Sequence, residues 1–276
     1  MKLLLSLMTF AALTLSVGAR AASDAPAART YSIALPAGEA QTLTLEFSVG
    51  QVAIKAGDTN TIKATVRAVP GNSGQFIFRW VAGNEKAGQL PSGLHLTHEM
   101  KDGTLTLCLS TNHCDNPHES GWKSEWEVIL PARLHVKLHG NVGKGTVNGV
   151  AGGLEMNLNV GKIEAELPCG PVKASLNVGN IETRVADADY GKVELSTNVG
   201  HVGFTVDGRS VDTGVDHNFV SNSQSLRGSG STPYAMSVNT GHIDLSLGDK
   251  RIPSNAACTA VVPQTTPAPQ PASHAQ

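Results

Sequence analysis

Aromatic residues are scarce in this chain, and neither sign of charge dominates it. Phe, Trp and Tyr make up 4% of the 276 residues, and region 140–250 contains only Tyr190, Phe204, Phe219 and Tyr234. So few rings leave no aromatic platform of the kind on which sugar-cleaving enzymes stack their substrates. Lys and Arg number 21 against 23 Asp and Glu. The chain therefore lacks the basic face that neutralises phosphate, which excludes a nucleic-acid partner.

Long apolar runs and catalytic motifs are also missing. After the N-terminal segment, no stretch is apolar enough to cross a bilayer. No Gly-x-Ser-x-Gly nucleophile elbow and no phosphate-binding glycine loop occur. We therefore predict no catalytic residue, no cofactor and no membrane span in the mature protein.

The N-terminus has the three-part layout of a secretory signal peptide. Lys2 supplies a positive charge, residues 3–17 form an almost unbroken apolar run, and small residues precede a cut after Ala21. The alternative is an uncleaved N-terminal anchor, although the run is short for a membrane span. No cysteine follows the cut closely, which argues against a lipid anchor. The sequence thus predicts an exported protein, located in the periplasm, outside the cell or on its surface.

The cysteines indicate disulfides. An even number in an oxidising compartment favours pairing, and the four are Cys108, Cys114, Cys169 and Cys258. Cys108 and Cys114 are close in sequence and flank a loop-like stretch, so this pair is favoured. Cys169 with Cys258 then follows by elimination. On sequence alone, three pairings remain open.

A dense polar group surrounds the first cysteine pair. His, Cys, Asp and Glu side chains within residues 108–119 could ligate a transition metal. The Cys-x5-Cys and Cys-x3-His spacings match no common zinc pattern, so a disulfide-pinned surface loop is preferred and no metal site is predicted. His135 and His139 share one strand face but would lie about 13 Å apart, too far to share an ion.

Most of the mature chain alternates apolar and polar residues over short runs, which is the signature of half-buried strands. The clearest runs are 42–47, 61–67, 104–109, 126–130 and 134–138. No helix-period stretch of useful length occurs after the signal peptide, so the predicted fold class is all-β. Residues 208–232, rich in Gly, Ser and Asn, are expected to form a long loop or an irregular rung.

A repeat is the strongest signal in the sequence. The triplet Asn-Val-Gly, or Asn-Thr-Gly in its last copy, ends at Gly143, Gly161, Gly179, Gly200 and Gly241. A strand-like run follows each Gly, and a second run precedes the next triplet. A fixed period near 20 residues indicates a solenoid, in which each rung buries its apolar side against its neighbours. We predict a β-solenoid or β-roll of about 18–21-residue rungs, preceded by an antiparallel-type β region.

The repeat also predicts ladders of equivalent side chains, because stacked rungs lie roughly 4.8 Å apart. Each Gly is expected to form a turn with φ > 0, and the Asn of each triplet could bond locally or form a corner ladder. The inner ladder would hold Ile163, Ile181, Val202 and Ile243. The outer positions after the glycines would form a polar stripe beside an acidic one. Its members are Lys144, Lys162, Asn180, His201 and His242, with Glu164, Glu182 and Asp244.

With these features the chain resembles the bacterial putative adhesin family. The resemblance covers roughly residues 42–248 and is carried by Phe-Ser-Val-Gly-Gln-Val-Ala-Ile at 47–54, the strand ending at Pro131 and the glycine-punctuated repeats. The family pattern has Thr or Ser and an acidic residue around each Gly, whereas Lys, Asn or His follows the Gly here. The resemblance implies a solenoid or β-roll fold and an adhesin-like role.

The predicted organisation has five segments. They are a signal peptide (1–21), a flexible lead with the first strand (22–40), an N-terminal β region (41–139), the solenoid repeats (140–250) and a disordered Pro/Ala/Gln-rich tail (251–276).

The predicted function is that of a non-catalytic envelope protein. It would act as an adhesin-like binding or scaffolding module whose polar stripe meets an envelope glycan or protein, although outward positions could also be polar for solvation alone. The alternative is a carbohydrate-active solenoid enzyme that uses Glu164 and Glu182, about one rung apart, as paired carboxylates. Self-association through unpaired solenoid ends is a third hypothesis.

Overall fold

The computed structural model describes residues 27–71, 89–111, 114, 122–211, 220–253 and 258. These residues contain strands and no α-helix, so the all-β prediction is confirmed for this part of the chain. The predicted signal peptide and nearly all of the predicted tail lie outside the described residues.

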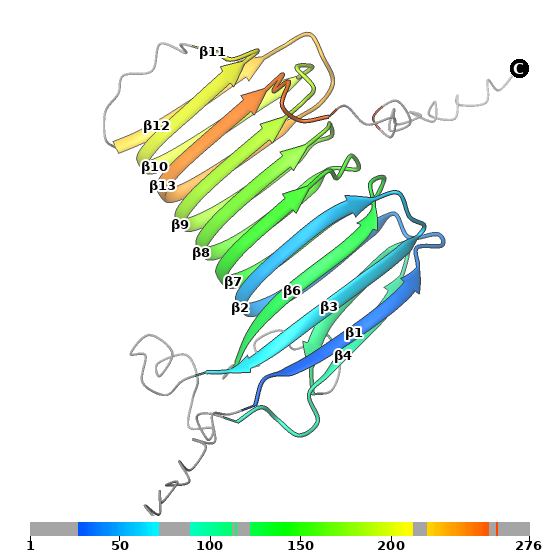
Figure 1. Ribbon diagram of the computed structural model, residues 1–276. Helices are drawn as coiled ribbons and strands as arrows, with labels where there is room; N and C mark the ends of the chain where they lie inside the picture. Colours follow the sequence, from blue (N-terminus) through cyan, green and yellow to red (C-terminus); the bar gives the residue numbers. More distant parts are fainter. Residues whose placement is uncertain are drawn as a thin grey trace, which may run out of the picture.

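Thirteen strands form one open sheet of mixed strand orientation (Figure 1). The first six are β1 (Arg29–Pro36), β2 (Thr42–Gly57), β3 (Thr61–Pro70), β4 (His95–Lys101), β5 (Thr104–Ser110) and β6 (Trp122–Pro131). The repeats form β7 (His135–Asn148), β8 (Leu154–Leu167), β9 (Val172–Val185), β10 (Lys192–Val206) and β13 (Tyr234–Leu247). Between the last two repeats lie β11 (Arg209–Ser210) and β12 (Val220–Arg227).

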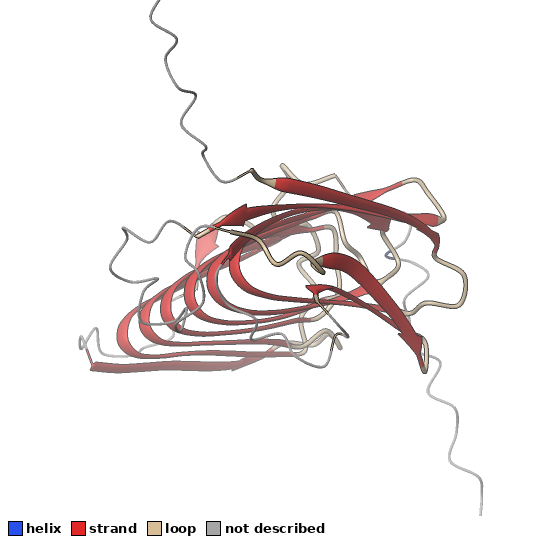
Figure 2. Ribbon diagram, turned by 90° about the horizontal axis from the view of Figure 1, so that it is seen from below, coloured by secondary structure: helices blue, strands red, loops and turns tan. Residues whose placement is uncertain are grey.

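Six long strands make the parallel centre of the sheet, in the order β2, β7, β8, β9, β13 and β10. Each strand bends at its Gly, and we call the part before the bend the first arm and the part after it the second arm (Figure 2). The sequence predicted two strands joined by a turn at each triplet. The structure has one continuous bent strand instead, because residues on both sides of the bend stay paired with the neighbouring strands.

The bend contains a column of six glycines, one from each parallel strand. Its members are Gly50, Gly143, Gly161, Gly179, Gly241 and Gly200, which are register partners in that order. A Cβ on Gly179 would lie 1.8 Å from the carbonyl oxygen of Gly161, and the other members would meet a neighbouring carbonyl equally closely. The backbone φ of Gly179 is +141°, whereas Gly143 is not among the residues with positive φ. Close backbone approach, more than the turn conformation, therefore requires glycine in every repeat.

Asparagine side chains follow the column along the corner, as one of the two sequence hypotheses expected. Asn159 Nδ2 donates to Asn141 Oδ1 at 3.1 Å, and Asn177 Nδ2 donates to Asn159 Oδ1 at 2.6 Å. At the β10 end, Asn222 Nδ2 donates to the carbonyl oxygen of Gly200 at 2.7 Å. The amide of Asn222 thus satisfies the last carbonyl of the glycine column.

The last repeat does not stack in sequence order. Strand β13 lies between β9 and β10 and is parallel to both. The inner ladder contains the four predicted residues and runs Ile163, Ile181, Ile243, Val202, which is not their order in the sequence. In the described residues of the long gap before the last triplet, no further parallel strand occurs. These residues contain β11 and β12, which pair antiparallel with β10, where the sequence predicted a long loop or an irregular rung.

At the other end, the two arms of β2 take different partners. The first arm pairs with β5, which pairs with β4, while the second arm pairs with β6, followed by β3 and β1. The outer pairings are antiparallel, as expected for the N-terminal region, but β2 itself is parallel to β5, β6 and β7. Strand β2 is thus the first member of the parallel set, and its Gly50 begins the glycine column.

The inner side chains of both arms belong to one hydrophobic core, in which large residues fill the space beside small ones. Phe47 and Leu158 occupy the space beside Gly140, where a Cβ would lie 2.4 Å from Phe47 Cζ. Met156 Sδ fills the corresponding space at Gly145. Such complementary volumes fix the neighbours of each strand.

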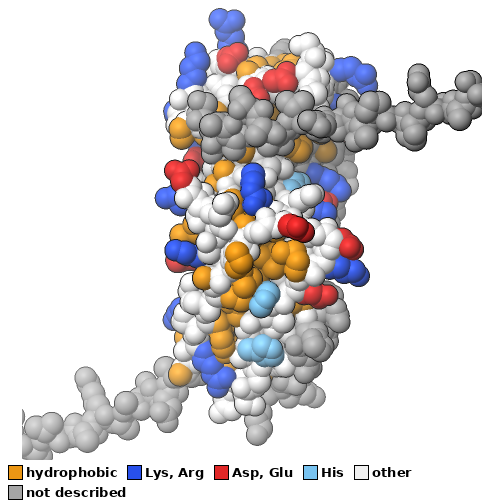
Figure 3. Space-filling view, turned by 90° about the vertical axis from the view of Figure 1, so that its right-hand side faces the viewer, with side chains coloured by type: hydrophobic (Ala, Val, Ile, Leu, Met, Phe, Trp, Pro, Cys, Tyr) orange, Lys and Arg blue, Asp and Glu red, His pale blue; other side chains and the backbone are white. Residues whose placement is uncertain are grey.

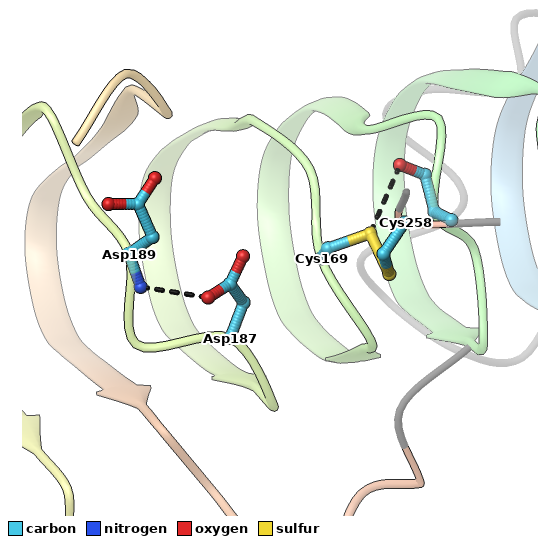
Figure 4. The surroundings of a disulfide bond; sticks show 5 residues. Cys169, Asp187, Asp189 and Cys258 are labelled. Atoms are coloured by element: carbon cyan, nitrogen blue, oxygen red, sulfur yellow. Dashed lines mark hydrogen bonds between the residues drawn. A yellow bond between two sulfur atoms is a disulfide. The ribbon is translucent and has the colours of Figure 1, made fainter. Parts of the chain in front are cut away.

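Both favoured disulfides are present. Cys108 is bonded to Cys114, and Cys169 is bonded to Cys258 (Figure 4). Cys169 follows β8, and Cys258 follows β13, so the second disulfide ties the chain end to the middle of the sheet.

Gly179→Ala tests the glycine column. The new Cβ would meet a backbone carbonyl at an unfavourable φ, so we expect the free energy of unfolding to fall by about 3 kcal/mol or more. The measurement is denaturant unfolding of the purified protein. Gly38→Ala is the control, since Gly38 also has positive φ but has no atom within 4 Å of the added Cβ. The expected loss there is about 1 kcal/mol. Equal losses of unfolding free energy in the two variants would contradict the conclusion that close backbone contact requires glycine in the column.

Replacing Cys169 and Cys258 together with Ser tests the second disulfide. It closes 89 residues of chain, against 6 for the first disulfide. The chain-entropy model gives about 4.6 kcal/mol of stabilisation for the longer loop and about 2 kcal/mol for the shorter. Thermal unfolding of each double variant should rank them in this order. If the variant without the Cys108–Cys114 disulfide unfolds at the lower temperature, the Cys169–Cys258 disulfide is not the more stabilising of the two.

Candidate binding face

All eight residues of the predicted stripes lie on the outer face of the second arms. Register pairing places Lys144, Lys162, Asn180, His242 and His201 in one row, and Glu164, Glu182 and Asp244 in the next. The alternation of a strand turns both rows outward, since they flank the inner isoleucine ladder. The order of His242 and His201 is exchanged relative to the sequence, because β13 precedes β10 in the sheet.

The charged members of the two rows pair with one another, both within one strand and across neighbouring strands. Lys144 Nζ and Lys162 Nζ each lie 2.6 Å from an oxygen of Glu164, and Lys162 also lies 3.5 Å from Glu182. Arg184 bridges Glu182 and Glu166 on the same face. Opposite charges thus alternate along this face, and most of its charge is balanced within the rows.

The ion pairs favour the charged form of the Glu164 carboxylate, which lies between two lysines. Hydrogen bonds from Lys144 and then Lys162 lower the pKa of Glu164 below its usual value. The same contact with Glu164 raises the pKa of Lys162. A glycosidase acid needs a carboxyl whose pKa is raised, so the environment of Glu164 opposes that role.

Three adjoining hollows cross this face, and we call them together the furrow. The first has a volume of about 410 Å³ and is lined by Arg67, Glu125, Lys144 and Thr146, among others. The second, of about 260 Å³, shares Thr146 with the first.

The third hollow extends the furrow to the C-terminal end of the described chain. It has a volume of about 460 Å³ and shares Asn148 and Glu166 with the second. Lys55, Arg251 and Pro253 also line it. The furrow therefore runs from β1 and β3 across β6, β2 and β7 to the segment after β13.

Short side chains line the furrow between longer charged ones. Ala53 and Thr146 are register partners on β2 and β7, and Asn148 follows Thr146 on the same outer face. Their neighbours Lys144 and Glu164 are longer and carry charge. Alternating side-chain length across adjacent strands leaves a hollow without any break in the backbone pairing.

Arg251 is held at the far end of the furrow by Asp249. The Asp249 side chain is 6% exposed, and its oxygens accept from Arg251 Nε at 2.8 Å and Nη2 at 2.5 Å. These hydrogen bonds lower the pKa of Asp249 to about 2. The sequence assigned Arg251 to a disordered tail, yet this bidentate contact fixes it directly after the last strand.

One side of the molecule combines apolar and charged side chains. Figure 3 looks at the side where the loops between the repeat strands lie, and it shows apolar side chains in the middle with charged ones along both borders.

The remaining predicted candidates form no second site among the described residues. Residues 112, 113 and 115–119 of the polar group lie outside the described residues, and its two cysteines form a disulfide. Among the described residues, no group of three or more His, Cys, Asp or Glu is placed to hold a metal ion. His135 Nδ1 lies 3.1 Å from the carbonyl oxygen of Gly152, so it has a structural partner. In the described ranges, no helix could cross a membrane.

Sequence reasoning found the rows but missed the furrow. Lys144, Glu164 and Glu182 line it, while Arg67, Glu125, Thr146 and Arg251 were not singled out. The repeat marks positions on consecutive rungs, whereas Arg67 and Glu125 come from the non-repeated strands β3 and β6. The Asp-x-Arg spacing after the last strand was the available signal for Arg251.

Comparison with known proteins gives matches among solved structures only. No family model matches the chain, and no curated protein matches it. A putative cell adhesion protein from Clostridium sporogenes is 16% identical with a TM-score of 0.47, over 80% of this chain and all of that one.

Two further solved structures are putative adhesins. The one from Parabacteroides merdae is 11% identical with a TM-score of 0.30, over 63% of this chain and 71% of that one. The one from Bacteroides fragilis is 12% identical with a TM-score of 0.28, over 80% and 98%.

Acid should weaken the Asp249–Arg251 contact. The pKa of Asp249 is lowered from 3.8 to about 2 in the folded protein, so its stabilising contribution is complete above about pH 4 and is lost as the pH falls towards 2. Asp249→Asn should therefore lose stability at pH 6 and show a smaller further loss between pH 4 and 2. Urea unfolding at several pH values measures this. Asp58→Asn, at an exposed carboxylate, is the control, and a wild-type pH dependence in Asp249→Asn would refute the prediction.

Proposed function

We propose that this protein is an exported, non-catalytic binding module of the adhesin-like type, whose furrow holds an extended glycan of low charge. In this proposal the six parallel strands are the rungs of a short β-solenoid, and the furrow crosses their outer face. The observation that carries it is the continuity of the three hollows through shared Thr146, Asn148 and Glu166. An elongated furrow suits a polymer better than a compact metabolite.

The lining favours a polyhydroxylated ligand. Arg67, Lys144 and Arg251 offer donors, Glu125 and Glu166 offer acceptors, and Thr146 offers both. Sugar hydroxyls donate and accept hydrogen bonds, so they can use both kinds of group. Because most charges along the rows are already paired, a strongly charged polymer would gain little and would disturb existing ion pairs.

Export is supported by the N-terminal sequence and by the disulfides. Residues 1–21 have the layout of a signal peptide. Two disulfides fit an oxidising compartment, such as the periplasm or the cell exterior. An envelope glycan is present in either location.

The furrow can be filled by mutation. Thr146→Trp places a large ring where the first two hollows meet, so we expect glycan affinity to fall about tenfold or more, equivalent to about 1.4 kcal/mol. The measurement is calorimetric titration with a panel of neutral and acidic soluble polysaccharides. Ser175→Trp is the matched control, since Ser175 lies outward on the first arm of β9, away from the furrow. Equal effects of the two variants would contradict binding in the furrow.

The alternative function is a carbohydrate-active enzyme. One observation favours it: Glu164 and Glu182 are direct register partners on adjacent strands. Both carboxylates form ion pairs with Lys144, Lys162 or Arg184, which fits a role in stabilising the fold better than a role as a catalytic acid. Cleavage of any panel polysaccharide that is lost in both Glu164→Gln and Glu182→Gln would establish the enzyme and overturn the non-catalytic proposal.

A further inference from the structure

Two histidines stand side by side at the β10 end of the outer face. His201 and His242 are direct register partners on the parallel strands β10 and β13. Their ring centroids are 6.5 Å apart, with an angle of 57° between the ring planes. Both side chains are exposed. Two imidazoles are thus presented from a rigid pair of strands at one point of the surface.

The imidazole nitrogens have no partner in the part of the chain that the structure describes. Neither the His201 nor the His242 side chain forms a hydrogen bond or ion pair there, in contrast to the side chains of His135 and His95, which each lie close to a backbone carbonyl. An imidazole nitrogen without a hydrogen-bond partner can use its lone pair to coordinate a metal ion.

The spacing of the two rings suits a shared metal ion. With metal–nitrogen bonds of about 2.0–2.1 Å, two imidazoles on one tetrahedral ion have ring centroids about 5 Å apart. The observed separation exceeds this by about 1.5 Å, which rotation about the side-chain torsions of exposed residues can close without any movement of the strands.

The surroundings favour a cation. Asp244 lies two residues after His242 on the same face, and its Oδ1 would lie 2.5 Å from a Cβ on Gly203 of β10. The carboxylate therefore leans across the space that Gly203 leaves open, beside the strand that carries His201. Among the described residues Asp244 has no Lys or Arg partner, unlike Glu164 and Glu182. The neighbour of His242 on β9 is Asn180, which is neutral.

We propose that His201 and His242 bind one divalent transition-metal ion of the Zn²⁺, Ni²⁺ or Cu²⁺ class. Imidazole nitrogen suits these ions, whereas Mg²⁺ and Ca²⁺ prefer oxygen ligands. Asp244 balances the charge of the ion from the adjacent row, and water or a group of a bound molecule fills the remaining coordination positions. This site is separate from the furrow and does not depend on the glycan proposal.

Titration of the mature protein with Zn²⁺ alone, followed by calorimetry, tests the site. His201→Ala and His242→Ala should each weaken binding by about tenfold or more, as the loss of one of two protein ligands requires. Asn180→His places a third imidazole in register beside His242 and should tighten binding. His139→Ala, on the first arm of β7, is the matched control and should leave this binding step unchanged. Since the side chains of Asn180, His201 and His242 are exposed, each of these variants should unfold at the wild-type temperature, which would show that it is folded.

A spectroscopic readout separates this site from other histidines of the chain. Electron paramagnetic resonance of the protein with one equivalent of Cu²⁺ should show two nitrogen ligands in the wild type and one in either single alanine variant. The proposal is overturned if the double variant His201→Ala with His242→Ala keeps the Zn²⁺ affinity and the Cu²⁺ spectrum of the wild type.

Discussion

Close packing of backbone at the bend is the constraint on which the rest of the structure depends. Each glycine of the column lies so near the carbonyl of the next strand that a single added carbon would collide with it. Only glycine avoids the collision at these positions, and the six parallel strands are in register where their glycines meet. The hydrophobic ladders inside and the polar rows outside follow from that register.

The binding face is a consequence of the same alignment. Because the strands are in register, Lys144 meets Glu164, Lys162 meets Glu182 and Arg184 meets Glu166, so charges balance across neighbouring strands. Short residues at the matching position of β2 and β7 then leave a hollow that Arg67 on one side and Arg251 on the other extend. A surface whose charges are already paired is suited to many weak polar contacts along a polymer, with little long-range attraction.

Features that depend on short sequence patterns could be predicted from the sequence. Features that depend on which distant segments lie side by side could not. The all-β class, the triplets, the stripe residues and both disulfides could be inferred because they depend on short patterns or on a small number of pairings. The place of β13 could not, since its triplet fits beside β9 or beyond β10 equally well. Strand β12 was missed because its alternation, Ser-Asn-Ser-Gln-Ser-Leu, has almost no apolar face. The furrow was missed because it joins repeat strands to β3, β6 and the segment after β13.

The position of β13 also sets an order of events during folding. Strand β10 precedes β13 in the chain, and until β13 is in place β9 has an unpaired edge with the same glycine spacing as β10. The final sheet requires that edge to be kept for a strand about 40 residues further along the chain. The native order therefore needs residues up to 247, and a non-native pairing of β9 with β10 would compete with it during folding. Once β13 is paired, the Cys169–Cys258 disulfide joins the segment after β13 to the segment after β8 and so opposes separation of β13 from the sheet.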